Sequence, residues 1–261
     1  LKSAYTSVNN KDIYTLAPYT VSKQINGVFK TKLNYWNIIK NTIFKRQKTF
    51  GDSSRLRDII LPKFFSSDDY ETSRSLKKEL IVGVTNLTKG QTEYYTNLED
   101  GMTYNDFLDW TFASTCAAPF MSIIEKNGSE YVDGAYLEHT PIQELINKGC
   151  TNIDVIIHKT PEIEVIKSKN PLQVTNRIID IMLFQNSSHE LNLAKLKAKD
   201  VDVILNIYKL DKKLTNNSLS FNKDLMNEWW ELGYNFAMEN KAESWRISKR
   251  KKPRKIEEED E

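Results

Sequence analysis

The stretch ELIVGVTNLTKG, residues 79–90, decides the fold prediction. Its apolar run from Leu80 to Val84 is short and rich in β-branched residues, which predicts a buried strand that ends near Asn86. A turn at Thr88–Gly90 separates this strand from a second strand-like stretch at 92–96. This part of the chain is therefore expected to lie in a sheet.

Apolar runs at 153–158 and 201–208 predict two further buried strands. Helices are predicted at four ranges, namely 103–115, 140–148, 171–199 and 222–243. Alternation of apolar strands with helices favours a mostly parallel sheet that is covered on both faces. We therefore expect an α/β fold.

The N-terminal part gives weaker patterns. Residues 11–49 carry apolar side chains at mixed helical spacings, interrupted by Pro18 and Gly27, and are expected to be helical. A turn with an N-cap at 51–54 precedes RLRDIIL, a short helix that Pro62 is expected to end. The charged, Ser-rich segment 63–78 is expected to be an exposed loop.

Charge is concentrated at the C-terminal end. The chain has 37 Lys and Arg against 35 Asp and Glu, and residues 246–255 hold seven basic side chains while 257–261 hold five acidic ones. The remaining body is formally neutral, so a generic polyanion-binding protein is not predicted. We expect one domain over 1–245 and a charged, disordered tail over 246–261.

Several kinds of site are excluded by spacing. His139, His158 and His189 are isolated, with no partner at i+4, and Cys116 and Cys150 form no CxxC, so neither an HExxH metal site nor a structural zinc site is predicted. No two of the nine glycines are two or four residues apart, which excludes GxGxxG and GxSxG motifs. No apolar run approaches the roughly 18 residues that span a bilayer.

One local constellation remains, YVDGAY at 131–136, in which Asp133 ends a short apolar stretch and Gly134 follows. On its own an Asp-Gly pair indicates a turn, because both residues tolerate turn backbone angles. Downstream, Thr140 and Pro141 are expected to be the N-cap and first residue of a helix.

The order of four segments is more informative than any of them alone. ELIVGVTNLTKG (79–90) is followed by FASTCAAPFM (112–121), then by YVDGAYLEHTPIQELINKG (131–149) and by LGYNFA (232–237). This succession resembles the patatin-like phospholipase family. The resemblance implies a three-layer α/β/α fold with a central, mostly parallel sheet, and it covers roughly residues 79–240.

The resemblance also implies a lipid acyl hydrolase that works with a Ser–Asp dyad through an acyl-enzyme. Asp133 matches the catalytic aspartate, the general base; Gly134 and Ala135 complete its motif. His139 stands where the family usually has Asn. Ser114 and Thr115 either line the wall of the site or belong to a close helix–sheet contact.

The family implies a lipid substrate at a membrane or micelle surface, without cofactor, metal or nucleic acid, and with other protein chains as further candidate partners. It also implies a cytoplasmic protein that associates peripherally with membranes.

The glycine-rich loop and the GxSxG nucleophile elbow, which precede these segments in the family, have no match here. Ser3 and Ser7 lack flanking glycines, so neither is expected to be the nucleophile. We therefore expect the C-terminal two-thirds of such a domain, with the strand–elbow–helix unit and its serine upstream of this chain. The alternative is a catalytically inactive patatin-fold module that binds a protein or a membrane.

Overall fold

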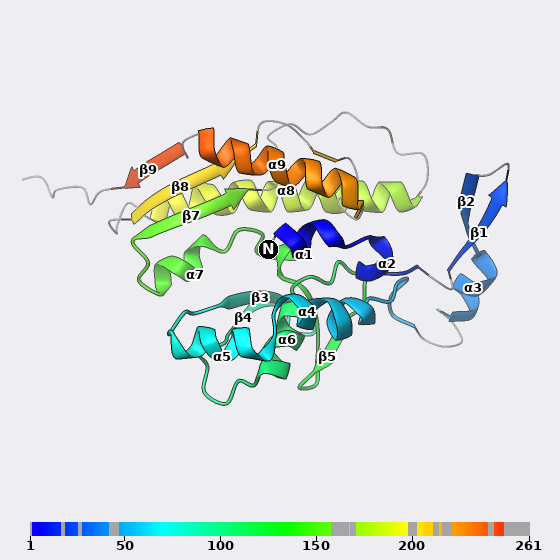
Figure 1. The fold of residues 1–261 in the computed structure, drawn as a ribbon, viewed down its shortest axis with the longest axis horizontal. Helices are drawn as coiled ribbons and strands as arrows, with labels where there is room; N and C mark the ends of the chain where they lie inside the picture. The colour runs from blue at the N-terminus through cyan, green and yellow to red at the C-terminus, as the bar shows by residue number, and fades with distance from the viewer. Residues whose placement is uncertain are drawn as a thin grey trace, which may run out of the picture. The chain divides into compact units, whose positions relative to one another are not determined.

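The computed structural model describes residues 2–16, 19–25, 28–41, 47–157, 167, 171–197, 203–210, 214–215, 221–239 and 243–247. They form a mixture of helices and strands (Figure 1). The chain divides into two compact units, Leu1–His139 with Leu214–Tyr234, and Thr140–Lys213 with Asn235–Glu261. Residues 248–261 of the predicted tail, and His158, lie outside the described residues.

The first unit begins with helices and a hairpin, which are α1 (Lys2–Ser7), α2 (Asn10–Ile13), β1 (Thr20–Ile25), β2 (Val28–Leu33) and α3 (Tyr35–Ile39). The helical prediction for 11–49 is therefore wrong over the two strands, which pair antiparallel from Thr20↔Leu33 to Ile25↔Val28. The strands flank Asn26-Gly27 in the sequence, and this dipeptide is the strongest short-range hairpin signal.

The next three elements are helical: η2 (Leu56–Ile60), α4 (Leu61–Phe64) and α5 (Ser67–Ser75). Pro62 does not end the short helix as predicted, because it lies in the first turn of α4, where a backbone N–H is not required. The prediction of a loop over 63–78 is also wrong. Ser66 and Asp69 form a capping box that starts α5.

A four-stranded sheet follows, made of β3 (Ile81–Asn86), β4 (Gln91–Thr96), β5 (Ile124–Lys126) and β6 (Ser129–Asp133) in the order β4-β3-β6-β5. Helix α6 (Tyr104–Ala113) contributes Trp110 and Ala113 to a core with Val84 and Tyr131. All three strand pairs are antiparallel, so this sheet is not the mostly parallel one expected. Short turns join β3 to β4 and β5 to β6, and only antiparallel strands can be joined that way.

The second unit holds α7 (Ile142–Asn147), β7 (Asn152–Ile157), α8 (Pro171–Lys197), β8 (Val203–Lys209) and β9 (Glu243–Ile247); α9 (Lys223–Glu239) runs through both units. The three strands form one sheet in the order β7-β8-β9. The β7–β8 pair is parallel, as predicted for these two strands, and β9 is antiparallel to β8.

The start of α7 differs from the prediction by one position. Pro141 is the N-cap residue, and the Thr140 hydroxyl instead contacts Ser187 of α8 at 3.2 Å. In the part of the chain that the structure describes, no helix has the length and hydropathy needed to cross a membrane.

Candidate functional site

Asp133 is held between a strand and a loop. It is the last residue of β6 and precedes a single 3-10 turn, η3 (Gly134–Tyr136). In the register of β3 and β6 it is paired with Val84. Its backbone N–H donates a hydrogen bond of 3.1 Å to the carbonyl oxygen of Cys116, in the loop after α6. These backbone contacts fix the position from which the side chain extends.

The Asp133 carboxyl group is only partly used by the protein. Oδ1 accepts a 2.9 Å hydrogen bond from the Ala135 N–H. Among the described residues, Oδ2 accepts no hydrogen bond, and no Lys or Arg forms an ion pair with this group. Burial raises the pKa of Asp133, and the Ala135 N–H opposes that shift only in part. The result is a carboxylate of increased basicity with one oxygen open to a new donor.

Gly134 brings the η3 turn against the backbone of β3. A Cβ atom at Gly134 would lie 2.4 Å from the carbonyl oxygen of Gly83 and 3.2 Å from the nitrogen of Val84. The Thr85 hydroxyl donates to the Gly134 carbonyl at 3.4 Å. A side chain at Gly134 would therefore collide with the backbone of β3.

Cys116, which is fully buried, lies beside the aspartate in the loop that follows α6. Burial raises the pKa of its thiol to about 12; the hydroxyl of Ser53 favours the thiolate slightly, and the charge of Asp133 disfavours it. A thiol with this pKa stays protonated at neutral pH, so Cys116 is not a nucleophile. Its contribution is the backbone carbonyl that receives the Asp133 N–H.

Tyr136 ties the other side of the turn to the same loop. Its hydroxyl donates a 2.5 Å hydrogen bond to the Ala118 carbonyl. Burial, followed by the nearby Asp133 and Cys116, raises the pKa of Tyr136 to about 12, so the phenol is neutral at physiological pH. The loop thus contacts the aspartate turn at two points, Cys116 and Ala118.

The other predicted site residues lie near the loop without a described contact to the carboxylate. Ser114 follows the last residue of α6 at its C-cap, and the exposed Thr115 donates its hydroxyl to the Phe112 carbonyl at 2.7 Å. Ala113 is fully buried against the sheet, which agrees with the close helix–sheet contact considered for this segment. His139 lies between η3 and α7 and has no described hydrogen bond to Asp133.

The hydrogen bonds and close backbone contact that support the Cys116 loop could not be predicted from the sequence. Ser53, which is fully buried, and Ser122 exchange hydrogen bonds, each backbone N–H donating to the other's hydroxyl at 3.1 and 3.0 Å. A Cβ atom on Gly51 would lie 1.9 Å from the Phe120 carbonyl. The GDSS segment (51–54) predicts only a turn and a helix cap, because nothing local in the sequence signals a partner some 70 residues away.

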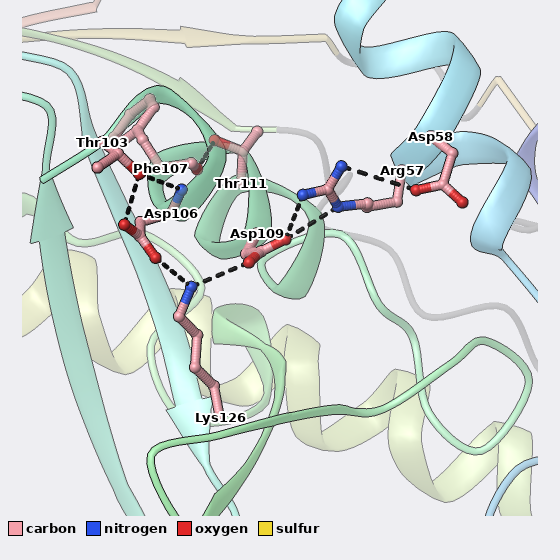
Figure 2. Close-up of polar contacts among 8 residues, drawn as sticks. All are labelled: Arg57, Asp58, Thr103, Asp106, Phe107, Asp109, Thr111 and Lys126. Carbon is pink, nitrogen blue, oxygen red and sulfur yellow. Dashed lines mark hydrogen bonds and ion pairs between the residues drawn. The ribbon is translucent and has the colours of Figure 1, made fainter.

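A cluster of charged residues anchors α6, the helix that leads into the loop (Figure 2). Lys126 of β5 donates to Asp106 at 2.7 Å and to Asp109 at 2.9 Å. Arg57 of η2 reaches Asp109 at 2.6 Å from the other side. Burial lowers the pKa of Lys126, but the hydrogen bonds to both aspartates outweigh this effect and the pKa is raised. Because both cations are paired with carboxylates, the cluster stabilises the helix and offers no open group for chemistry.

No family model matches this chain, and no curated protein sequence matches it. Within the described ranges, no group of three or more His, Cys, Asp or Glu side chains is arranged to hold a metal ion. The candidate site therefore stands on the geometry of Asp133 and its two supporting segments.

Proposed function

We propose that this chain carries the general base of a lipid acyl hydrolase, with Asp133 acting in a Ser–Asp dyad on an ester substrate. The supporting observation is the carboxyl group itself, which is held by backbone contacts, has a raised pKa and keeps Oδ2 available. The resemblance of the motif order to patatin-like phospholipases points to the same residue. The three-layer patatin-like architecture is part of this proposal.

The chemistry asked of Asp133 is a proton transfer. Its free oxygen would accept the proton of a serine hydroxyl as that oxygen attacks the ester carbonyl, and would return it to the leaving alcohol. A base works best when its basicity approaches that needed at the working pH, so burial without an ion-pair partner is favourable. These 261 residues contain no serine in a GxSxG turn. We therefore assign only the general base, Asp133, to this chain.

If Asp133 only stabilised the turn, its side chain would need to accept a hydrogen bond but would not need to accept a proton. The hydrogen bond from the Ala135 N–H uses Oδ1 alone, and an Asn side chain could accept it equally well. Asp133→Asn therefore removes the proton acceptor while keeping the turn. This separates a catalytic role from a role in stabilising the turn.

The test uses the full-length gene product, measured for hydrolysis of phospholipid esters and for labelling by a fluorophosphonate. Asp133→Asn is expected to reduce hydrolysis about 100- to 10,000-fold and to reduce labelling, since the serine would lose its base. Asp100→Asn, an exposed aspartate in the same unit, is the matched control and is expected to retain activity. Undiminished labelling with intact lipid hydrolysis in the Asp133 variant would rule out the dyad.

A further inference from the structure

The turn that joins β5 to β6 holds an Asn-Gly dipeptide, Asn127–Gly128. Lys126 and Ser129 are paired across it, so these two residues alone make the turn. Both have a positive φ, 52° for Asn127 and 73° for Gly128. Two successive residues of this kind are typical of the type I′ turn, which matches the twist of a hairpin. The dipeptide therefore forms the tip of the hairpin whose second strand ends at Asp133.

The two groups that could react within this dipeptide are unrestrained. Asn127 is exposed, and its side-chain amide makes no described hydrogen bond. Gly128 is also exposed, and its N–H donates to no acceptor among the described residues. No atom of the described residues lies within 4 Å of a Cβ atom built on Gly128. The backbone nitrogen of Gly128 and the amide carbon of Asn127 are thus open to each other and to water.

Other asparagines of the same unit are held by their neighbours. Asn97 is fully buried, and its Nδ2 donates to the Ser73 hydroxyl at 2.8 Å and to the Lys78 carbonyl at 3.0 Å. Its Oδ1 accepts from the Leu80 N–H at 2.8 Å. Asn86 is also fully buried and bonded through both polar atoms of its side chain. Each of these two asparagines precedes a leucine, whereas the turn asparagine precedes a glycine, which leaves the most room at the next nitrogen.

We propose that Asn127–Gly128 is a site of spontaneous deamidation. The Gly128 nitrogen loses its proton to solvent and attacks Asn127 Cγ. The bond from Cγ to the side-chain nitrogen breaks, that nitrogen takes up a proton, and ammonia leaves a five-membered succinimide ring. Water then opens the ring. Breaking the new bond from nitrogen to Cγ gives aspartate, and breaking the original peptide bond gives isoaspartate. Water is the only co-reactant, and nothing is oxidised or reduced.

The two products have different consequences for the hairpin. Aspartate keeps the main chain and tolerates positive φ, so it changes only the charge of the turn. Isoaspartate adds a methylene to the main chain of a two-residue turn, which fixes the register of the two strands. The register pairs Lys126 with Ser129, and Lys126 is the cation shared by Asp106 and Asp109 (Figure 2). Isoaspartate is therefore expected to weaken the pairing of β5 with β6. None of this depends on the proposed hydrolase activity.

The test is incubation of the folded full chain at pH 6 and at pH 8, followed by tryptic mapping. Cleavage after Lys126 and Lys148 gives one peptide, 127–148, that contains Asn127 and also Asn147 as an internal control. Asn127 is expected to gain a carboxyl group while Asn147 and Asn97 stay amides. The rate should rise about ten-fold per pH unit, because the attacking nitrogen must lose its proton.

Isoaspartate is detected by labelling with an isoaspartyl methyltransferase. Asn127→Gln, which cannot close the five-membered ring, is expected to lose this label, and any label left in the variant measures other residues of the peptide. Thermal melts verify that the variant is folded. The second Asn-Gly dipeptide, Asn26–Gly27, lies outside the described residues and in a separate peptide, 24–30, so its modification is measured apart.

Hydrogen exchange measures the effect on the hairpin. Chains that carry isoaspartate at this position are expected to lose protection of the β6 amides, whereas Asn127→Asp should keep the protection of wild type. Equal protection in the isoaspartyl chains would refute the weakening of the hairpin. An Asn127 amide that survives in the folded chain but not in the urea-unfolded chain would overturn the deamidation site itself, as would equal rates at Asn127 and Asn147. All of these readouts are independent of lipid hydrolysis, so failure of the hydrolase proposal leaves them unchanged.

Discussion

Replacing Gly134 with Ala tests whether the aspartate turn is packed against β3 as closely as described. The new Cβ would lie 2.4 Å from the Gly83 carbonyl oxygen and 2.7 Å from its carbon. Both obstacles are backbone atoms of a central strand, so no flexible side chain can move aside. Relieving the contact requires the turn and the strand to separate by roughly 0.6 Å, the gap to the 3.0 Å that real Cβ atoms respect.

Overpacking of this kind typically costs about 1–3 kcal/mol, and the rigid obstacle places Gly134→Ala at the upper end. Because Ala has less conformational entropy than Gly in the unfolded chain, the substitution also stabilises the folded state by up to about 1 kcal/mol, which offsets part of this cost. The net expectation is a loss of about 2 kcal/mol, equivalent to a fall of about 4–8 °C in Tm for a chain of this size. Denaturant titration and thermal melts measure both quantities.

Gly233→Ala is the matched control within the same unit. Gly233 lies inside α9 with nothing within 4 Å of its added Cβ, so helix propensity should make this variant about 0.5–1 kcal/mol more stable. If Gly134→Ala is as stable as wild type, or if the Gly233 variant is the more damaged of the two, the described contact between η3 and β3 is incorrect.

Three further predictions concern ionisable groups. Because burial raises the folded-state pKa of Asp133 above its unfolded value, its stabilising contribution is complete below the unfolded pKa and is lost as pH rises through the folded one. The Tm advantage of Asp133→Asn over wild type should therefore grow with rising pH and then level off; an advantage that grows toward acid would contradict this. Cys116, with a thiol pKa of about 12, should react with a thiol reagent at pH 8 only after denaturant is added, and rapid native reaction would show that it is accessible. Lys126→Met leaves Asp106 and Asp109 without their shared cation and should cost about 1–3 kcal/mol, measured by denaturant titration at low salt; an unchanged midpoint would mean that the cluster in Figure 2 does not stabilise α6.

Local patterns predicted the middle of the chain well. The strand pair at β3 and β4 and the helix α6 follow from short apolar runs, turn residues and a Thr cap that all lie close together in sequence. The β1–β2 hairpin and α5 were missed, although Asn26-Gly27 and the Ser66–Asp69 capping box are local signals too. The mixed apolar spacing of 11–49 is typical of a helix, whereas the turn dipeptide within it indicates a hairpin.

For the candidate site, too, local sequence identifies the residues but not their distant contacts. Asp133, Gly134 and Ala135 could be identified because their motif is contiguous. The backbone contacts that hold Asp133 in place come from the Cys116 carbonyl in the loop after α6 and from β3, about 50 residues earlier. No local pattern encodes such pairings. The direction of strand pairing was wrong for a related reason, because apolar content predicts burial but does not specify which neighbour a strand chooses.

The first unit is built from two separate segments of the chain, Leu1–His139 and Leu214–Tyr234, and this affects how the chain folds during synthesis. Its N-terminal helices are completed by residues from α9, since Val8, Ile13 and Leu56 share a core with Met226. The Phe221 N–H also donates to the Asn10 side chain. Residues 140–213, which belong to the other unit, must leave the ribosome before this core can close. The core of the first unit is therefore expected to stay incomplete, with apolar surface exposed, while residues 140–213 of the second unit are synthesised. Chaperone binding would protect the nascent chain during this period.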